Sequence, residues 1–227
     1  MRLALQGEAL PLWVSAERQT AGRGRAGRTW HSAPGNLAAS AAFRTFAAPA
    51  AAGQLSLTAG VMLFEALAAI TPLGRQGRLR LKWPNDLLIG GAKAGGILVE
   101  SALNSGGSGM AGVIGFGLNV VSEPGIGRSV TSLHREGVAL DADSVLGALA
   151  DAFETWLEIW DEGRGFAFVR ASWLERGGPR GEPITINTGA GSVSGTYQGL
   201  SESGALLADV EGTLETFNFG DVALGTG

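Results

Sequence analysis

Two short segments of the chain carry the side chains best suited to chemistry on an anion. The first, residues 19–30, reads QTAGRGRAGRTW and alternates glycine with arginine. Glycine permits positive φ and a close backbone approach, and guanidinium groups offer forked donors to phosphate or carboxylate. We expect this loop to fold over a small polyanion, while a solvated surface loop and an RNA-binding Arg-Gly element stay open as alternatives. Its candidate residues are Gln19, Gly22, Arg23, Gly24, Arg25, Arg28 and Trp30.

The second segment contains the only two lysines of the chain. Lys82 begins the run KWPND, residues 82–86, and Lys93 begins the run KAGGILVE, residues 93–100. Asp86 follows a Pro-Asn turn and is suited to accept a proton or orient a nucleophile, whereas Lys93 on the facing strand is suited to neutralise a phosphate. The alternative is an Asn-Asp turn beside two solvated lysines.

Composition limits the class of protein. The 227 residues are 45% hydrophobic and 17% charged, which is typical of a globular chain with one main core and a small satellite. Cysteine is absent, so disulfides, thiolate catalysis and cysteine-bound metals are excluded. The two histidines, His31 and His134, are far apart in the sequence, and we expect no structural metal. The net charge of −4 argues against nucleic acid or anionic membranes as partners, and without a signal peptide or a long apolar run we expect a cytoplasmic protein.

The elements that position these segments follow from hydrophobic periodicity and from turn residues. Helical spacing over 55–70 and 141–162, with Asp141 or Asp143 as the N-cap of the latter, predicts two long helices, and a shorter one follows at 166–176. Residues 105–109 are expected to form a turn, and Gly90-Gly91 a tight hairpin turn. The predicted strands of this part of the chain are 12–17, 36–43, 79–83, 87–89, 97–101 and a buried central strand at 110–120.

A domain boundary is predicted at the run GGPRG, residues 177–181, because it combines flexible residues with a helix breaker. We therefore divide the chain into a first domain, 1–178, and a small β domain, 180–227. The second domain is expected to be a partly closed barrel that leans on the first, because about 45 residues bury too little apolar area alone. Its predicted strands are 183–188, 193–200, 205–210 and 213–219.

Four ordered motifs resemble the catalytic domain of biotin protein ligases, within the biotin/lipoate ligase superfamily. They are GRGRxGRxW at 22–30, KWPND at 82–86, KxxGILVE at 93–100 and GxGxN at 115–119. The β-rich end resembles the family's C-terminal domain. The resemblance implies an α+β fold, with a class II synthetase-like mixed sheet and packed helices, and a small C-terminal SH3-like β-barrel.

The resemblance also implies a two-step reaction. Biotin and ATP form biotinyl-5′-AMP and pyrophosphate, with Mg²⁺ accompanying ATP, and a lysine of a biotin carboxyl-carrier domain then accepts the biotinyl group. Lys93, Asp86 and Arg25 would be catalytic: Lys93 would bond the ligand's carbonyl or phosphate oxygens, and Asp86 would hold or deprotonate the carrier lysine. Gln19 would contact biotin, Trp30 would pack near the adenine and Asn119 would lie beside the nucleotide. The binding residues implied are Gln19, Gly22, Arg23, Gly24, Arg28, Trp30, Asn85, Gly96 and Asn119.

One departure from the family precedes the arginine loop. Ligases of this type carry a Ser-Thr pair that contacts biotin, and no Ser-Thr dipeptide occurs before residue 19. Either the chain starts downstream of that strand or the pocket is incomplete. Two alternatives follow, namely a non-catalytic ligase-like protein that binds a nucleotide or acyl-adenylate, and a relative that handles lipoate or octanoate. A homodimer is open, and repressor activity through an N-terminal helix-turn-helix is not expected.

Overall fold

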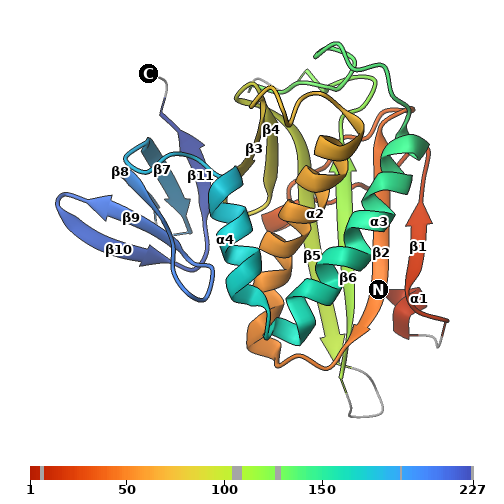
Figure 1. The fold of residues 1–227 in the computed structure, drawn as a ribbon, viewed down its shortest axis with the longest axis horizontal. Coiled ribbons are helices and arrows are strands. Elements are labelled where there is room, and N and C mark those ends of the chain that lie inside the picture. The colour runs from red at the N-terminus through yellow and green to blue at the C-terminus, as the bar shows by residue number, and fades with distance from the viewer. Residues whose placement is uncertain (6–7, 104–108, 126–128, 190, 226–227) are drawn as a thin grey trace.

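The larger part of the molecule is built on a six-stranded sheet, seen in a computed structural model that describes residues 1–5, 8–103, 109–125, 129–189 and 191–225. In spatial order its strands are β1 (Leu12–Ser15), β2 (Leu37–Thr45), β6 (Met110–Leu118), β5 (Ala92–Leu103), β4 (Asp86–Ile89) and β3 (Leu79–Lys82). These strands pair antiparallel, and one isolated parallel bridge joins Lys93 to Val130. The long strands β2, β5 and β6 lie side by side at its centre (Figure 1).

Three helices cover one face of this sheet (Figure 1). They are α2 (Gln54–Ile70), α3 (Ala142–Trp160) and α4 (Phe166–Arg176). The predicted helices are thereby confirmed, and Asp141 is the N-cap of α3, because its carboxylate accepts from Ser144 N at 2.7 Å. The segment Pro49–Ile70 is long and apolar enough to cross a membrane, with a mean hydropathy of 1.5 over 18 of its residues, yet 56% of these 18 residues are buried here. It serves as the core helix, since Leu55, Leu63 and Leu67 are fully buried against the sheet and the other helices.

A second, five-stranded sheet lies on the far side of α4 (Figure 1). Its strands in spatial order are β10 (Thr213–Phe217), β9 (Leu206–Val210), β8 (Gly191–Leu200), β7 (Pro183–Thr188) and β11 (Asp221–Leu224). Trp83, directly after β3, donates its indole N–H to Gly204 O at 3.2 Å and so links the two sheets. The α+β fold with packed helices and a strand-rich C-terminal end is confirmed.

The C-terminal strand differs from the prediction. A single strand at 213–219 was expected, but β10 ends at Phe217 and β11 follows it, antiparallel to β7. Gly220, at φ 139°, occupies a backbone conformation that favours glycine and lies between the two strands. The split was missed because β11 has only four residues, which is too short for a periodic pattern to stand out. It matters for function, because β11 reaches the arginine loop.

Several short elements were also not predicted. They are the helix α1 (Arg2–Leu5) and the 3₁₀ helices η1 (Arg25–Gly27), η2 (Pro49–Gly53) and η3 (Asp161–Gly163). The turn expected at 105–109 falls almost entirely on residues 104–108, outside the described part of the chain. The hairpin turn at Gly90-Gly91 is confirmed, with φ 58° and 85°, and β5 begins directly after it, earlier than expected.

Candidate active site

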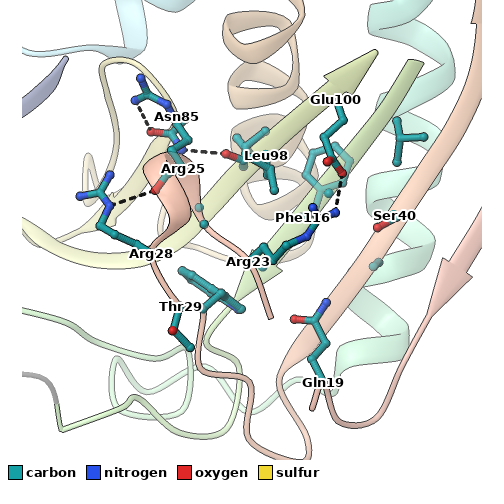
Figure 2. A pocket seen from close by; sticks show the side chains of 18 of the residues that line it. Gln19, Arg23, Arg25, Arg28, Thr29, Ser40, Asn85, Leu98, Glu100 and Phe116 are labelled. Carbon is teal, nitrogen blue, oxygen red and sulfur yellow. Dashed lines mark hydrogen bonds and ion pairs between the residues drawn. The ribbon is translucent and has the colours of Figure 1, made fainter. Parts of the chain in front are cut away.

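A cavity of about 310 Å³ opens between the arginine loop and the central strands β2, β5 and β6 (Figure 2). The structure thereby gathers residues that lie far apart in the sequence. The predicted site residues that line it are Gln19, Arg23, Gly24, Arg25, Arg28, Trp30, Asn85, Lys93 and Gly96. Three other predicted residues, Gly22, Asp86 and Asn119, lie next to it and do not line it.

The arginine loop has a defined conformation that its own backbone maintains. Gly24 N donates to Arg28 O at 2.7 Å, and Trp30 N donates to Gly22 O at 2.9 Å. The contact at Gly22 requires glycine, because a Cβ there would lie 2.3 Å from Trp30 O. Gly22 therefore shapes the loop, and its neighbours in the sequence line the cavity.

Each of the three predicted loop arginines forms an ion pair with a carboxylate from another part of the chain. Arg23 lies across the cavity toward Glu100 of β5, at 3.0 Å (Figure 2). Arg28 bonds Asp221 of β11 at 2.7 Å, and Arg25 bonds the same carboxylate at 3.5 Å. The result is an array of guanidinium groups along the cavity, a suitable lining for phosphate oxygens.

Arg25 has the largest set of partners among these arginines. Besides Asp221, its guanidinium donates to Gly220 O at 3.2 Å and to Asn85 Oδ1 at 3.4 Å. Asn85 is itself fixed, because its side-chain amide donates to Ile97 O at 2.7 Å. The side chain of Arg25 is therefore positioned by both sheets at once.

Asp86 lies behind the cavity and is almost completely buried, with 8% of its surface exposed. Its carboxylate bonds two ammonium groups, Lys93 on one oxygen and Lys82 on the other at 2.9 Å. Burial raises the pKa of Asp86, but the charges and the hydrogen bonds of Lys93 and Lys82 together lower it by more, so the pKa lies below its usual value. Asp86 is thus a carboxylate at neutral pH and positions Lys93, whereas the role as base for an incoming lysine stays a prediction.

Trp30 packs against two glycines of the central strands. A Cβ on Gly117 would lie 2.4 Å from the indole ring, and one on Gly96 would lie 3.3 Å from it. Lys93 Nζ lies 5.8 Å from the ring centroid, in position for a cation–π contact. Gly117 was missed as a site residue, although it belongs to the GxGxN motif, and its absent side chain makes room for Trp30.

Asn119 lies in a small hollow on the other side of Trp30. Its side-chain amide donates to Thr131 O at 3.0 Å, while Oδ1 is buried with no hydrogen-bond partner among the described residues. The side chains that surround the hollow are those of Thr29, Trp30, His31, Lys93, Asn119, Pro124 and Val130. A buried acceptor without a partner is costly, so Asn119 is suited to receive a donor from a ligand.

The wall of the cavity opposite the arginine loop is formed by small and apolar residues of the central strands that the sequence analysis missed. They are Ala39, Ser40, Ile97, Leu98, Val113, Gly115, Phe116 and Gly117. Gln19 and Ser40 add polar side chains on the β2 side (Figure 2). The available signal was the run of small residues in β2 and β6, but only the pairing of these strands shows that they share one wall.

The sequence matches the model of the biotin/lipoate A/B protein ligase family over residues 5–119. The chain belongs to this family. A second model, the biotin protein ligase C-terminal domain, matches residues 181–225. The resemblance seen in the four motifs is therefore confirmed.

Relatives and solved structures agree with this membership. The chain is 40% identical to the biotin–acetyl-CoA-carboxylase ligase of Paracoccus denitrificans over 202 residues, which are 86% of this chain and 82% of that protein. It is 33% identical to the bifunctional ligase/repressor BirA of Escherichia coli over 92% of this chain, and it spans 65% of BirA's length. The biotin protein ligase of Aquifex aeolicus in complex with biotin and ATP superposes with a TM-score of 0.80 and 28% identity, covering 100% of this chain and 94% of that one.

Proposed function

We propose that this protein is an ATP-dependent biotin protein ligase that forms biotinyl-5′-AMP and transfers biotin to a lysine of a carboxyl-carrier domain. The observation that carries the proposal is one cavity with two unlike walls. The arginine loop supplies three arginines and β5 supplies Lys93, while the central strands supply small and apolar residues, with Gln19 and Ser40 beside them. The similar structure from A. aeolicus was solved with biotin and ATP, which supports the same pair of substrates here.

In the first step, the carboxylate of biotin attacks the α-phosphorus of ATP and pyrophosphate leaves. Both reactants are anions, so cations must bring them together and stabilise the charge that develops on the phosphate oxygens. Lys93 and Arg25 fit this role, because each lines the cavity and is held by a carboxylate. Arg23 and Arg28 add positive charge along the same loop.

The shape and polarity of the cavity suggest where biotin and the adenine of ATP bind. Biotin fits the apolar wall beside Gln19, and its carboxylate then points toward Lys93. The adenine fits near Trp30, where Asn119 Oδ1 is available as the acceptor for an amino group. An aromatic ring supplies stacking and the amide oxygen supplies recognition of the exocyclic amine.

Mg²⁺ would accompany ATP. Among the described residues no cluster of three or more His, Asp or Glu side chains could hold a metal, and Glu100 and Asp221 are each paired with arginine. The triphosphate would therefore supply most of the ligands of Mg²⁺, which commonly keeps several waters. The metal would neutralise part of the phosphate charge.

In the second step, the carrier lysine attacks the acyl carbonyl carbon and AMP leaves. The arginine loop shields the mixed anhydride from water until the carrier binds. A biotin carboxyl-carrier domain is the proposed partner, and the cytoplasm, which supplies ATP, is the proposed location. Asp86 as a base for the carrier lysine is tested by Asp86→Asn, through single-turnover transfer from preformed biotinyl-AMP.

The function is tested by incubating the purified chain with ATP and biotin, without and with a carrier domain. We expect pyrophosphate release in the first case and labelled carrier in the second. Lipoate and octanoate are tested in place of biotin, and at the same concentration neither should support pyrophosphate release or labelling of the carrier. Nucleotide binding without pyrophosphate release would contradict the proposal and would favour a non-catalytic binding protein.

A further inference from the structure

The two lysines of the chain share one carboxylate at the edge of the cavity. Lys82 Nζ lies 2.9 Å from one oxygen of Asp86, and Lys93 Nζ bonds the other. The side chains are mostly buried, with 19% of Lys82 and 16% of Lys93 exposed. Lys93 lines the cavity and Lys82 does not. The amine of Lys93 would therefore lie beside the acyl-adenylate that the enzyme forms in the proposed reaction.

This position creates a chemical conflict for a ligase that forms an acyl-adenylate. A neutral amine attacks such an intermediate, and the carrier lysine must do so while Lys93 must not. In water about one lysine in 10³ is neutral near pH 7.4, but burial favours the neutral form and raises that share. A carboxylate at hydrogen-bond distance opposes this effect, because it stabilises the ammonium form.

We propose that Asp86 keeps Lys93 in its ammonium form and thereby prevents the ligase from acylating itself. The inference rests on the proposed function. In the step that Asp86 prevents, Lys93 Nζ attacks the acyl carbonyl carbon, an amide bond forms and the bond from that carbon to the phosphate oxygen breaks. AMP leaves with the electron pair, and the proton of the amine passes to water. The product would lack the cation that the next cycle needs.

The surroundings of Lys93 support this assignment. Asp86 comes from β4 and Lys82 from β3, while Arg25 of the loop lines the same cavity and Trp30 offers a neutral ring face. The ammonium of Lys82 is also held by Val222 O at 2.8 Å, so it stays beside Asp86. Without the carboxylate, the positive charge of Lys82 would remain close to Lys93, and Arg25 would remain in the same cavity. Like charges and burial both favour loss of its proton.

The test compares the wild-type chain with Asp86→Asn and Asp86→Glu, each incubated with biotinyl-AMP and no carrier. Intact mass and peptide mapping measure the biotin on each lysine, and only two lysines need to be resolved. We expect at least 10-fold more label on Lys93 in Asp86→Asn than in the wild type or in Asp86→Glu, which keeps the charge. Equal labelling of Lys93 in all three proteins would overturn the proposal.

Second variants assign the label. Asp86→Asn with Lys93→Arg should lose it, and Asp86→Asn with Lys82→Arg should keep it. Label that follows Lys82 in place of Lys93 would show that the wrong amine has been assigned.

A chemical probe separates this proposal from the proposed function. N-hydroxysuccinimidyl acetate reacts with neutral amines, needs no ATP or biotin and is applied across pH 7 to 10. In the wild type, the acetylation rate of Lys93 should stay below that of a lysine peptide and keep rising to pH 10. In Asp86→Asn the acetylation rate of Lys93 should reach its plateau at a lower pH than in the wild type.

Each failure then has its own signature. A wild type that releases no pyrophosphate contradicts the proposed function, while the acetylation profile still tests Asp86. If melting curves show that Asp86→Asn does not fold, the pH dependence of Lys93 acetylation in the wild type tests the proposal by itself. A rate for Lys93 equal to that of the peptide at neutral pH would overturn the inference.

Discussion

Asp221 of β11 bonds Arg28 of the arginine loop at 2.7 Å, although 193 positions separate the two residues in the sequence. The same carboxylate bonds Arg25 at 3.5 Å, so one residue of the C-terminal sheet positions two cations of the cavity. The five-stranded sheet thus contributes to the site without lining it. This arrangement leads to a direct test.

Replacing Asp221 with asparagine should raise the KM for ATP about 3- to 10-fold, because two long side chains would have to be ordered when the nucleotide binds, at about 1 kcal/mol. The melting temperature should change little, since these ion pairs are partly exposed. Pyrophosphate release at varied ATP measures the effect. Glu215→Gln on the exposed face of β10 is the matched control, and equal KM values for the two variants would contradict the role of Asp221.

Replacing Lys93 with alanine should lower adenylate formation at least 10²-fold, as expected for a lost group that stabilises developing charge. The fold should survive, because the buried carboxylate of Asp86 keeps its bond to Lys82 at 2.9 Å. Pyrophosphate release and a melting curve are measured together, with exposed Arg75→Ala as the control for a lost positive charge. Unfolding of the Lys93 variant, or full pyrophosphate release, would show that its role is structural or absent.

The pH dependence of stability should reveal the stabilisation that the ionised carboxylate of Asp86 contributes. Its pKa in the folded protein lies below the usual value, because the charges and hydrogen bonds of Lys93 and Lys82 together outweigh the effect of burial. The stabilisation is therefore complete above the unfolded pKa, which is about 4, and is lost as the pH falls through the folded pKa. The difference in melting temperature between the wild type and Asp86→Asn should be constant from pH 5 to 8 and shrink below about pH 4. A difference that grows toward low pH would mean that the pKa is raised.

Replacing Gly117 with alanine should displace the ring of Trp30, because the new Cβ would lie 2.4 Å from it. We expect at least a 10-fold higher KM for ATP, with a folded protein and an altered near-ultraviolet circular dichroism spectrum. Gly125→Ala is the control, since among the described residues no atom beyond its chain neighbours lies within 4 Å of a Cβ at that position. Normal ATP binding by Gly117→Ala would remove Trp30 from the nucleotide site.

The chemistry of the site and the long elements could be predicted from the sequence because both are local properties. The helices at α2, α3 and α4 follow from apolar residues at helical spacing, and Asp141 at the start of α3 is a local capping signal. The arginine loop and the lysine segment follow from residue types within a few positions of one another. Their order along the chain was sufficient to indicate the family.

The partners of these residues depend on the tertiary structure. Glu100 faces Arg23 across 77 positions, Asp221 faces Arg28, and Asp86 turns inward to two lysines, one from each neighbouring strand. The apolar wall of the cavity arises because β2, β6 and β5 pair in a register that places their small residues together. Strand order and register are set by burial over the whole molecule, and no local spacing encodes which strands will be neighbours. The sequence therefore determined which groups could do the chemistry, and the packing of the two sheets decided which of them act together.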